Sequence, residues 1–252
     1  MKPSIDEAWI WGRHAVQSAL EGGRPIHKLY CLAGREADPA IGRLRARARE
    51  QGIVVQEVAR PRLDQMVGGE AHQGVVALIA ARSYAGFDAI LQACRERPDP
   101  LVIILDGIED PHNLGAIVRT ACCAGAVGVV IPERRAAGLS GVVEKAAAGA
   151  LEHVPVARVT NLVRAIEELK EAGVWIVGAE ADGPQLPYAV DLKGAIGLVI
   201  GSEGQGMHRL VREHCDFVVR LPLAGPVNSL NASVAAGVLM FEAVRQRQAS
   251  TS

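Results

Sequence analysis

Aromatic residues are scarce in this sequence, since Phe, Trp and Tyr together make up 4 % of the 252 positions. Surfaces that stack several unpaired bases are built from these side chains, so a stacking platform of that kind is not expected. An excess of charge of one sign is also missing, because 27 basic and 28 acidic residues leave a net charge of −1. The overall charge therefore provides no argument for binding nucleic acid.

Cysteine motifs and long apolar runs are missing as well. The five cysteines form no C-x-x-C pair, and an odd, scattered set in a chain of this length is typical of reduced thiols in the cytosol. No H-x-x-x-H pair is present, so no metal site is predicted. No apolar run approaches the roughly 18 residues of a membrane span, and the N-terminus has acids where a signal peptide has bases. We expect a soluble, cytoplasmic protein with no membrane partner.

What is present is the composition of a folded globular protein, with 49 % hydrophobic and 22 % charged residues. The length predicts one large domain or two modest ones, at about 150 residues per domain. Residues 1–85 contain 12 basic and 9 acidic side chains, whereas the remainder contains 15 and 19. We predict an N-terminal domain at residues 1–81, a linker at 82–100 that ends in a Pro-Asp-Pro segment, and a second domain at 101–252.

The N-terminal domain is predicted to be a small α/β unit, because β-rich runs alternate with helical patterns. A helical turn is expected at residues 63–66. Strands are predicted at residues 9–11, 26–32, 53–58 and 75–80, and helices at 13–20 and 40–51.

The second domain is predicted to be an α/β unit with a doubly wound parallel sheet. Residues 101–105 form a continuous apolar run, as expected for a strand that is buried on both faces. Similar runs alternate with helical patterns along the rest of the domain, which is typical of a parallel sheet. Further strands are predicted at residues 127–131, 175–179, 196–200 and 217–221, and helices at 113–124, 141–150, 162–172, 207–213 and 232–248.

Three polar loops follow predicted strands, and ligands bind at the carboxyl ends of strands in open parallel sheets. The first loop runs from Asp106 to Asn113, which we interpret as the N-cap of a helix that also holds Arg119. Spacing alone favours the simpler interpretation, in which Asn113 only caps the helix and Arg119 lies on the surface.

The second loop, residues 201–206, has the spacing G-x-x-G-x-G. Dinucleotide-binding folds have G-x-G-x-x-G and P-loops have Gly-Lys-Ser/Thr, so a phosphate cradle is disfavoured, and Glu203 would repel a polyphosphate. The third loop, residues 222–231, carries Asn228, Ser229 and Asn231 before the last helix. Capping of that helix explains one of these three side chains.

Two segments of the N-terminal domain leave a contact with RNA open. Residues 72–74, His-Gln-Gly, form either a turn or an RNA contact, and the turn is favoured. A basic cluster is interpreted either as a solvated helix or as an edge that contacts phosphates. The cluster consists of Arg43, Arg45, Arg47 and Arg49.

Taken together and in this order, the three loops resemble the motifs of the SpoU (TrmH-type) family of RNA ribose 2′-O-methyltransferases. The resemblance covers residues 106–121, 198–207 and 221–235, and segments at 12–16 and 72–74 extend it to the N-terminal domain. Within the family, the chain is most similar to the bacterial 23S ribosomal RNA guanosine-2′-O-methyltransferases, which act in the peptidyl-transferase region.

The resemblance implies a parallel-sheet catalytic domain with a C-terminal trefoil knot, an N-terminal RNA-binding domain and a homodimer. Rules of chain topology alone argue against a knot. The family resemblance also implies that the methyl group of S-adenosylmethionine is transferred to the ribose 2′-OH of a guanosine in 23S ribosomal RNA. The alternatives are a transfer-RNA ribose methyltransferase and a non-catalytic RNA-binding protein that keeps the fold.

Site residues are carried over from the family position by position. Where the family often has Ile, this chain has Leu221, and contacts made through the backbone should survive that change. The implied cofactor-binding residues are Ile200, Gly201, Leu221, Ser229, Leu230 and Asn231. The implied catalytic residues are Asn113, Arg119, Glu203, Ser229 and Asn231, and Arg119 matches the family's catalytic arginine.

The chemistry of methyl transfer limits what these side chains have to do. The methyl donor is already activated, so alignment of donor and acceptor supplies much of the acceleration. The ribose hydroxyl is weakly acidic and must lose its proton as the new bond forms. A guanidinium is a poor base, so our hypothesis is that Arg119 clamps the neighbouring phosphate and hydroxyl, oriented by Asn113 and Glu203. DNA lacks the acceptor hydroxyl and is excluded as a substrate.

Overall fold

The computed structural model describes residues 7–23, 25–34, 38–80 and 82–249. They form two compact units, one from Met1–Ser83 with Gly138–Glu152 and the other from Tyr84–Ala137 with His153–Ser252. The predicted ends of the N-terminal domain, residues 1 and 81, lie outside the described residues. The domain boundaries at 1–81, 82–100 and 101–252 therefore remain predictions.

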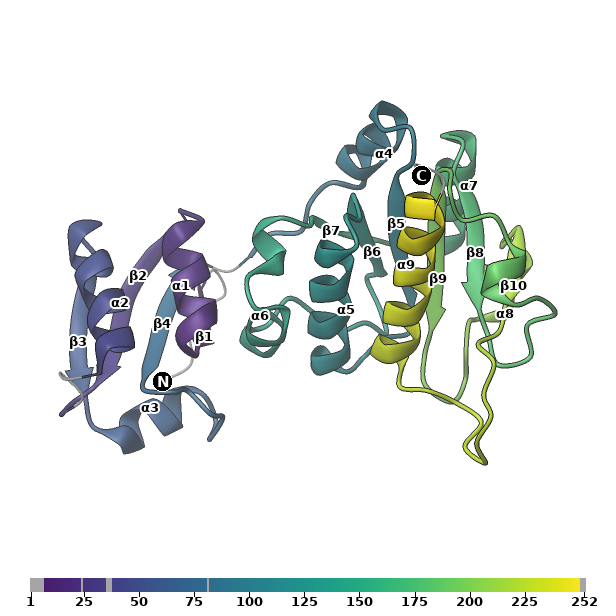
Figure 1. Ribbon diagram of the computed structural model, residues 1–252. Helices are drawn as coiled ribbons and strands as arrows, with labels where there is room; N and C mark the ends of the chain where they lie inside the picture. The colour runs from purple at the N-terminus through teal and green to yellow at the C-terminus, as the bar shows by residue number, and fades with distance from the viewer. Residues whose placement is uncertain (1–6, 24, 35–37, 81, 250–252) are drawn as a thin grey trace. The chain divides into compact units, whose positions relative to one another are not determined.

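The first unit is built on a four-stranded sheet with the strand order β1-β4-β2-β3 (Figure 1). Strand β4 runs antiparallel to β1 and β2, whereas β3 pairs with β2 in parallel. The strands are β1 (Glu7–Trp11), β2 (Ile26–Leu32), β3 (Val54–Val58) and β4 (Val75–Ala80), and the helices are α1 (Arg13–Glu21), α2 (Pro39–Glu50) and α3 (Arg60–Met66).

Alternating side chains of these strands face two separate apolar clusters, as the period of two in a strand requires. Ile10, Leu29 and Ile79 pack with α1 and α2 on one face of the sheet. Trp9 and Tyr30 pack with α3 on the other face. The sheet is therefore covered by helices on both sides, and the predicted small α/β unit is confirmed.

The second unit is built on a six-stranded sheet with the order β10-β8-β9-β5-β6-β7. Every pairing in it is parallel, and all six residues of β5 are buried. The predicted α/β class with a parallel sheet is thus confirmed. The strands are β5 (Leu101–Asp106), β6 (Gly128–Pro132), β7 (Val156–Val159), β8 (Trp175–Ala179), β9 (Ile196–Gly201) and β10 (Phe217–Val219).

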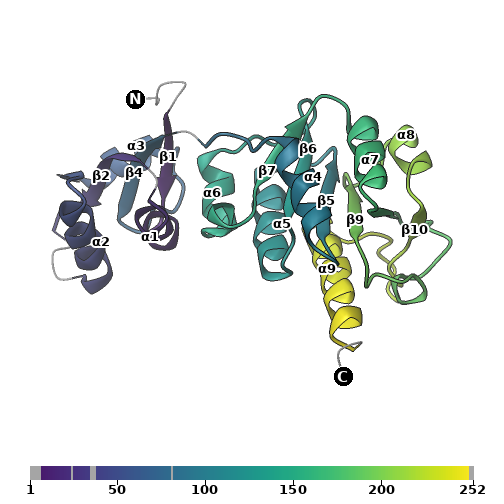
Figure 2. The same ribbon diagram turned by 90° about the horizontal axis from the view of Figure 1, so that it is seen from above.

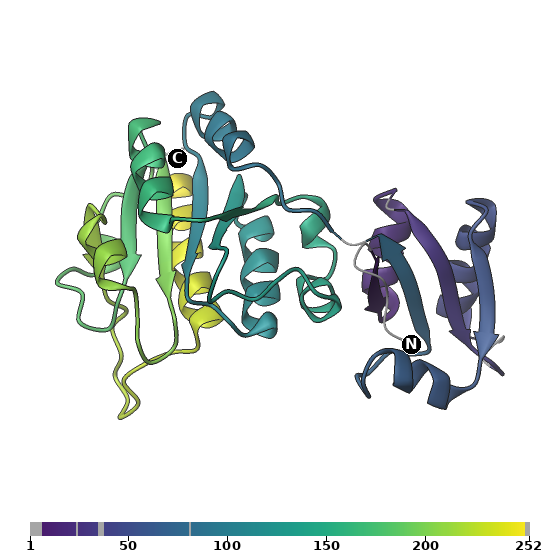
Figure 3. The same ribbon diagram turned by 180° about the vertical axis from the view of Figure 1, so that it is seen from behind.

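Helices cover both faces of this sheet, as the views from the front, above and behind show (Figures 1, 2 and 3). One face carries α4 (Phe87–Glu96), α7 (Leu162–Glu171) and α8 (Arg209–Glu213), which share one apolar cluster. The other face carries α5 (Pro111–Cys123) and α9 (Ala232–Ala249), which pack side by side. A helix α6 (Gly141–Ala147) and two short 3-10 turns, Ala150–Glu152 and Pro187–Ala189, complete the elements of the described residues.

Two details differ from the sequence-based expectation. Strand β7 was not predicted, because Pro155 and Arg158 interrupt the apolar pattern of a short strand at the sheet edge. Helix α5 begins at Pro111 and is capped by Asp110, whose side chain accepts the N–H of His112 at 3.0 Å. The prediction of Asn113 as the N-cap is wrong, because a proline at the first helical position moves the start of the helix upstream.

The last helix is fastened to the connection between β8 and β9. Gln246 is buried, and its side chain accepts the N–H of Leu192 at 2.9 Å and donates to the carbonyl of Val190 at 3.2 Å. At Gly183 an added Cβ would lie 2.4 Å from the carbonyl carbon of Val219, so this connection crosses β10 in close contact. The C-terminal helix and β10 are therefore both packed against the connection between β8 and β9.

No helix of the described residues is both long enough and apolar enough to cross a lipid bilayer.

Candidate active site

The loops that follow β5 and β9 start side by side in the middle of the parallel sheet. Asp106, the last residue of β5, is in register with Gly201, the last residue of β9. From β5 the chain leads to β6, its neighbour on the side away from β9. From β9 it leads to β10, which lies on the opposite side, beyond β8. Such a reversal of strand order opens a crevice at the carboxyl ends of the strands.

Side chains from all three predicted loops meet at this crevice. The carboxylate oxygen Oε1 of Glu203 accepts hydrogen bonds from the amide Nδ2 atoms of Asn231, at 2.7 Å, and Asn113, at 2.9 Å. It also accepts the backbone N–H of Ala232 at 3.1 Å. Asn231 Nδ2 lies 2.9 Å from Asn113 Oδ1, which closes the triangle. We call Asn113, Glu203 and Asn231 the amide–carboxylate triad.

The start of α9 holds this triad in place. Asn231 Oδ1 accepts the N–H of Ser233 at 2.9 Å, so one end of the Asn231 side chain caps the helix while the other end faces Glu203. The Glu203 carboxylate also lies at the positive end of the helix dipole, where negative charge is stabilised. Asn231 therefore both caps α9 and forms part of the candidate site.

A pocket of about 280 Å³ lies between the ends of β8, β9 and β10 and the start of α9. Five of the six predicted cofactor-binding residues line it, and Asn231 lines the neighbouring pocket. Gly201 is required at its position because an added Cβ would lie 2.3 Å from the carbonyl carbon of Gly206. The five lining residues are Ile200, Gly201, Leu221, Ser229 and Leu230.

The chemistry of this pocket fits S-adenosylmethionine. Leu223 and Leu230 line the pocket with their side chains about 40 % exposed, which is an open apolar wall that suits a flat heterocycle. Glu180 and Glu203 also line it, and carboxylates suit a ligand that carries sulfonium and ammonium groups.

Glu180 is fixed at the wall by two donors. Its Oε1 accepts the N–H of Met207 at 3.2 Å, and its Oε2 accepts from Nε of Arg212 at 2.6 Å. The hydrogen bond to Glu180 raises the pKa of the Arg212 guanidinium above its ordinary value.

A neighbouring pocket of about 400 Å³ shares Ser202 and Glu203 with the first one. All three members of the amide–carboxylate triad line it, so the triad stands at the boundary of the two pockets. The two pockets therefore adjoin at Glu203.

His208 lines this second pocket, and Asp106 binds His208 from below the pocket wall. Neither residue was among the predicted site residues. Asp106 is buried, and its carboxylate accepts the backbone N–H of His208 at 2.7 Å and lies 2.8 Å from His208 Nδ1. Arg135 Nη1 lies 3.2 Å from the other ring nitrogen, so Nδ1 carries the proton and Nε2 accepts. The signal in the sequence that could have indicated this carboxylate is an acidic residue at the end of a continuous apolar run.

Arg119 is the predicted site residue that the structure leaves apart from the others. It is exposed on α5 and lines neither pocket. It lies six residues beyond Asn113, which turns its side chain roughly 120° around the helix. Our hypothesis was that Asn113 and Glu203 orient Arg119. Among the described residues of one chain, neither side chain contacts Arg119, and both bind Asn231 instead.

Metal ligands do not gather at this site or elsewhere in the described part of the chain, where no three His, Cys, Asp or Glu side chains are placed to hold an ion.

Two family models match the chain. The SpoU rRNA Methylase family model matches residues 100–241, and a model for RNA 2′-O ribose methyltransferase substrate binding matches residues 9–85. YacO of Bacillus subtilis (strain 168), named as a TrmH family tRNA/rRNA methyltransferase, is 50 % identical over 240 residues, which cover 95 % of this chain and 96 % of YacO.

Solved structures show the same likeness. An S-adenosylmethionine-bound rRNA methyltransferase from Sinorhizobium meliloti is 27 % identical, with a TM-score of 0.77 over 95 % of this chain and 87 % of that chain. A TrmH/SpoU tRNA modifying enzyme from A. aeolicus is 29 % identical, with a TM-score of 0.54 over 66 % of this chain and 86 % of that chain.

Proposed function

Since the chain belongs to the SpoU rRNA Methylase family of S-adenosylmethionine-dependent RNA 2′-O-ribose methyltransferases, we propose that it methylates a guanosine in the peptidyl-transferase region of 23S ribosomal RNA. The observation that carries this proposal is the triad of Asn113, Glu203 and Asn231 at the boundary of two adjoining pockets. The first pocket would hold the cofactor and the second the target ribose.

The cofactor supplies a methyl group that is already activated for transfer, so the protein has to position the acceptor. Ile200, Gly201, Leu221, Ser229 and Leu230 would hold the cofactor, and Ser229 with Asn231 would shape the acceptor side. Asn113 and Asn231 present amide groups to the second pocket, and their geometry is fixed by the Glu203 carboxylate. Fixed polar groups need no rearrangement during the reaction, which is how a preorganised site lowers a barrier.

Ribosomal RNA is favoured over transfer RNA by the extent of the matches. The rRNA methyltransferase from Sinorhizobium meliloti aligns with 95 % of the chain, whereas the tRNA modifying enzyme from A. aeolicus aligns with 66 %. The family model for substrate binding that matches residues 9–85 supports a role for the first unit in binding a large RNA. A substrate of this kind places the activity in the cytoplasm and excludes DNA, which lacks the 2′-OH.

We also infer that the protein works as a homodimer through α9. Val234, Val238 and Phe241 are each about half exposed and recur at helical spacing, so they form one apolar stripe. Such a stripe on a helix surface is typical of a protein interface. Thr120 of α5 lies 3.6 Å from where a Cβ of Gly237 would be, so α5, the helix that carries Arg119, packs against α9.

The dimer gives Arg119 a role that it cannot have within one chain. A two-fold partner docked on the stripe would bring its Arg119 towards the pockets, because the stripe begins one turn after Asn231. In this arrangement each active site uses the amide–carboxylate triad of one protomer and Arg119 of the other, which clamps the phosphate next to the target ribose.

Mixing two inactive variants tests this arrangement. Arg119→Ala and Glu203→Ala subunits are purified, unfolded together and refolded, so that mixed dimers form. If Arg119 acts across the dimer, a mixed dimer contains one intact site, and methyl transfer returns. If activity stays absent although two differently tagged variants co-purify as mixed dimers, Arg119 does not act across the interface.

Methyl transfer itself is tested with tritiated S-adenosylmethionine and 23S ribosomal RNA from cells that lack the gene. The expected result is incorporation at one guanosine ribose, mapped by resistance of the next phosphodiester bond to alkali. Incorporation into transfer RNA but not into 23S RNA would support the transfer-RNA alternative. RNA binding without any incorporation would support a non-catalytic RNA-binding protein.

A further inference from the structure

Arg135 belongs to the second pocket but has no role in the function proposed above. It lies in the loop that follows β6, and its exposed side chain lines the pocket. Among the described residues that line this pocket, Arg135 is the one lysine or arginine. Since a guanidinium stays charged at all working pH values, Arg135 provides a permanent positive charge at a place that a substrate can reach.

The backbone of Arg135 is held in a conformation that side chains rarely adopt. Its φ is 56°, which lies in the left-handed region. The chain is bound on both sides of this residue. The N–H of Glu133 donates to the carbonyl of Val159 at 2.9 Å. The N–H of Ala137 donates at 2.8 Å to the carbonyl of Ile108, which also lines the pocket. Unfavourable backbone that the surrounding structure fixes in this way is typical of ligand sites.

The guanidinium of Arg135 is oriented by a ring nitrogen and not by a carboxylate. Its Nη1 donates to Nε2 of His208 at 3.2 Å, and the buried Asp106 fixes the His208 ring from the other side. In the part of the chain that the structure describes, no carboxylate lies within ion-pair distance of Arg135. The side chain therefore has a defined position while its charge stays available.

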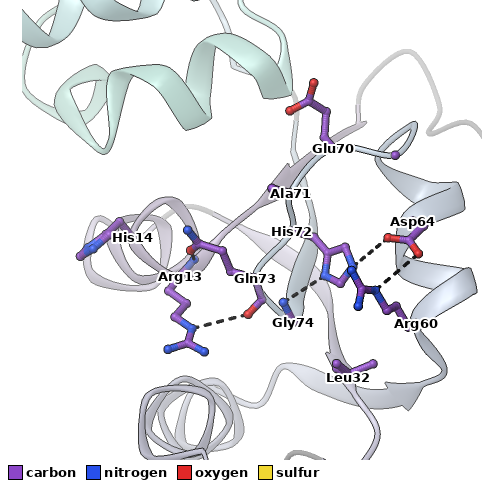
Figure 4. A pocket seen from close by; sticks show the side chains of 11 residues that line it. Arg13, His14, Leu32, Arg60, Asp64, Glu70, Ala71, His72, Gln73 and Gly74 are labelled. Atoms are coloured by element: carbon purple, nitrogen blue, oxygen red, sulfur yellow. Dashed lines mark hydrogen bonds and ion pairs between the residues drawn. The ribbon is translucent and has the colours of Figure 1, made fainter.

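Two arginines that line a cavity of about 640 Å³ in the first unit show a different arrangement (Figure 4). Arg60 Nε lies 3.8 Å from a carboxylate oxygen of Asp64. Arg13 Nη2 lies 2.6 Å from a carboxylate oxygen of Asp38. Both of these charges are compensated by an acid, whereas the charge of Arg135 is left for a ligand that carries negative charge.

Carboxylates line the second pocket as well, and two of them are already bound within the chain. Glu203 accepts three hydrogen bonds at the triad, and Asp110 accepts the N–H of His112. Together with Glu109 they make the pocket acidic. A phosphate that enters the pocket is therefore stabilised only where a fixed cation outweighs this repulsion, and Arg135 is such a cation.

We propose that Arg135 binds one of the two phosphates that flank the target ribose, within the chain that contributes the amide–carboxylate triad. The inference rests on the RNA methyltransferase function proposed above. A guanidinium presents its N–H donors as a planar fork that fits two phosphate oxygens, and His208 takes only one of these donors. Because a ribose inside an RNA chain has a phosphate on each side, Arg119 of the other protomer can bind the second one.

The guanine base is the alternative ligand for Arg135, since a guanidinium also pairs with O6 and N7 of guanine. An uncompensated positive charge gains more from an anion than from a neutral base, so the phosphate is favoured. The two ligands are distinguished by 7-deazaguanosine, in which N7 is replaced by carbon and all phosphates are kept.

The test uses 23S RNA fragments made of two pieces, with the break on the 5′ or the 3′ side of the target guanosine. Each substrate is made with and without a terminal phosphate on the target nucleotide. The measured quantity is kcat/KM for methyl transfer at saturating S-adenosylmethionine in 0.1 M salt. The variant is Arg135→Gln. The matched control is Arg134→Gln, which removes the same charge from the neighbouring exposed residue that lines neither pocket.

On one side of the target, the phosphate should raise kcat/KM about fivefold in the wild type and in Arg134→Gln, as expected for one ionic contact at this salt concentration. Arg135→Gln should gain nothing from that phosphate. With uninterrupted RNA, its kcat/KM should be about fivefold lower than in the wild type, and the slope of log kcat/KM against log salt should be smaller by about 0.7. Calorimetry should show unchanged affinity for S-adenosylmethionine, because Arg135 does not line the first pocket.

The inference is overturned if Arg135→Gln gains as much as the wild type from the phosphate on each side, or if Arg134→Gln loses the same gain. With 7-deazaguanosine at the target, the wild type and Arg135→Gln should be slowed by the same factor. A smaller effect on Arg135→Gln would show that Arg135 contacts the base, and the phosphate assignment would be wrong. If the wild type transfers no methyl group to any of these RNAs, the proposed function fails, whereas methyl transfer that is equal in Arg135→Gln and the wild type refutes the role of Arg135 alone.

Discussion

Replacing Glu203 by glutamine removes the charge from the centre of the amide–carboxylate triad and keeps its size. In the wild type, one carboxylate oxygen accepts from Asn231, Asn113 and the N–H of Ala232 at 2.7, 2.9 and 3.1 Å. A glutamine oxygen still accepts, but without charge assistance, and the new NH2 group adds a donor where donors already converge. Asn113 and Asn231 should therefore lose their fixed orientation.

The size of the effect follows from those three contacts. A buried hydrogen bond to a charged group contributes about 1.5–3 kcal/mol, but Glu203 is exposed and solvent screening reduces each contact. We estimate a total of about 1–2 kcal/mol for the lost charge, which corresponds to a factor of about 5–30 in rate if the triad acts in the transition state. The melting temperature should change little, because the triad lies outside the apolar core.

The assay is single-turnover transfer of a tritiated methyl group, with S-adenosylmethionine binding measured in parallel by calorimetry. Glu213→Gln is the control, since Glu213 pairs with Arg209 on exposed α8 and lines neither pocket. The reasoning is refuted if Glu203→Gln reacts at the wild-type rate, or if its rate falls no further than that of the control. A large loss of thermal stability would also contradict it, because the triad would then act on the fold.

Four further changes test other parts of the argument. Gly201→Ala places a Cβ 2.3 Å from the backbone of Gly206, so the loop must shift, and calorimetry should show S-adenosylmethionine binding at least about tenfold weaker. Arg119→Lys keeps the charge but loses the planar fork, so single-turnover methylation should fall clearly, and near wild-type rates would contradict a clamp. Phe241→Asp should give a monomer by light scattering, whereas an unchanged dimer would exclude the α9 stripe as the interface. Burial raises the pKa of the Cys215 thiol from 9.0 to about 12, so above pH 9 the unfolded chain loses a proton that the folded chain keeps. Stability should then fall between pH 9 and 12, and thermal melts of Cys215→Ala should show a weaker fall.

The family and most elements of both units could be predicted from the sequence. Continuous apolar runs such as residues 101–105 predict strands buried on both faces, and the structure has β5 there. The resemblance to the SpoU family rests on residue patterns in three loops, and the match of that family's model confirms it. Strand β7 escaped because a short edge strand with Pro155 and Arg158 has no continuous apolar run.

The candidate site could be predicted only in part. The pocket lined by Gly201, Leu221 and Leu230 agrees with the residues expected to hold the cofactor, although their roles remain predictions. The link between Asp106 and His208 was not predicted, because the two residues are 102 positions apart and no pattern in the sequence indicates that they meet. The expected contact of Arg119 with Asn113 and Glu203 is not found within one chain, since six positions along a helix turn a side chain to another face.

The sequence by itself determined which segments are strands, helices and loops, and which family's residues the loops carry. These properties are local, because they depend on apolar periodicity, glycine and proline positions and short motifs. Only the tertiary structure decided that Glu203 binds Asn113, 90 positions away, and Asn231, 28 positions away. That meeting depends on the parallel register of β5 and β9, which sets Asp106 beside Gly201, and pairing between distant strands is a property of the folded sheet as a whole.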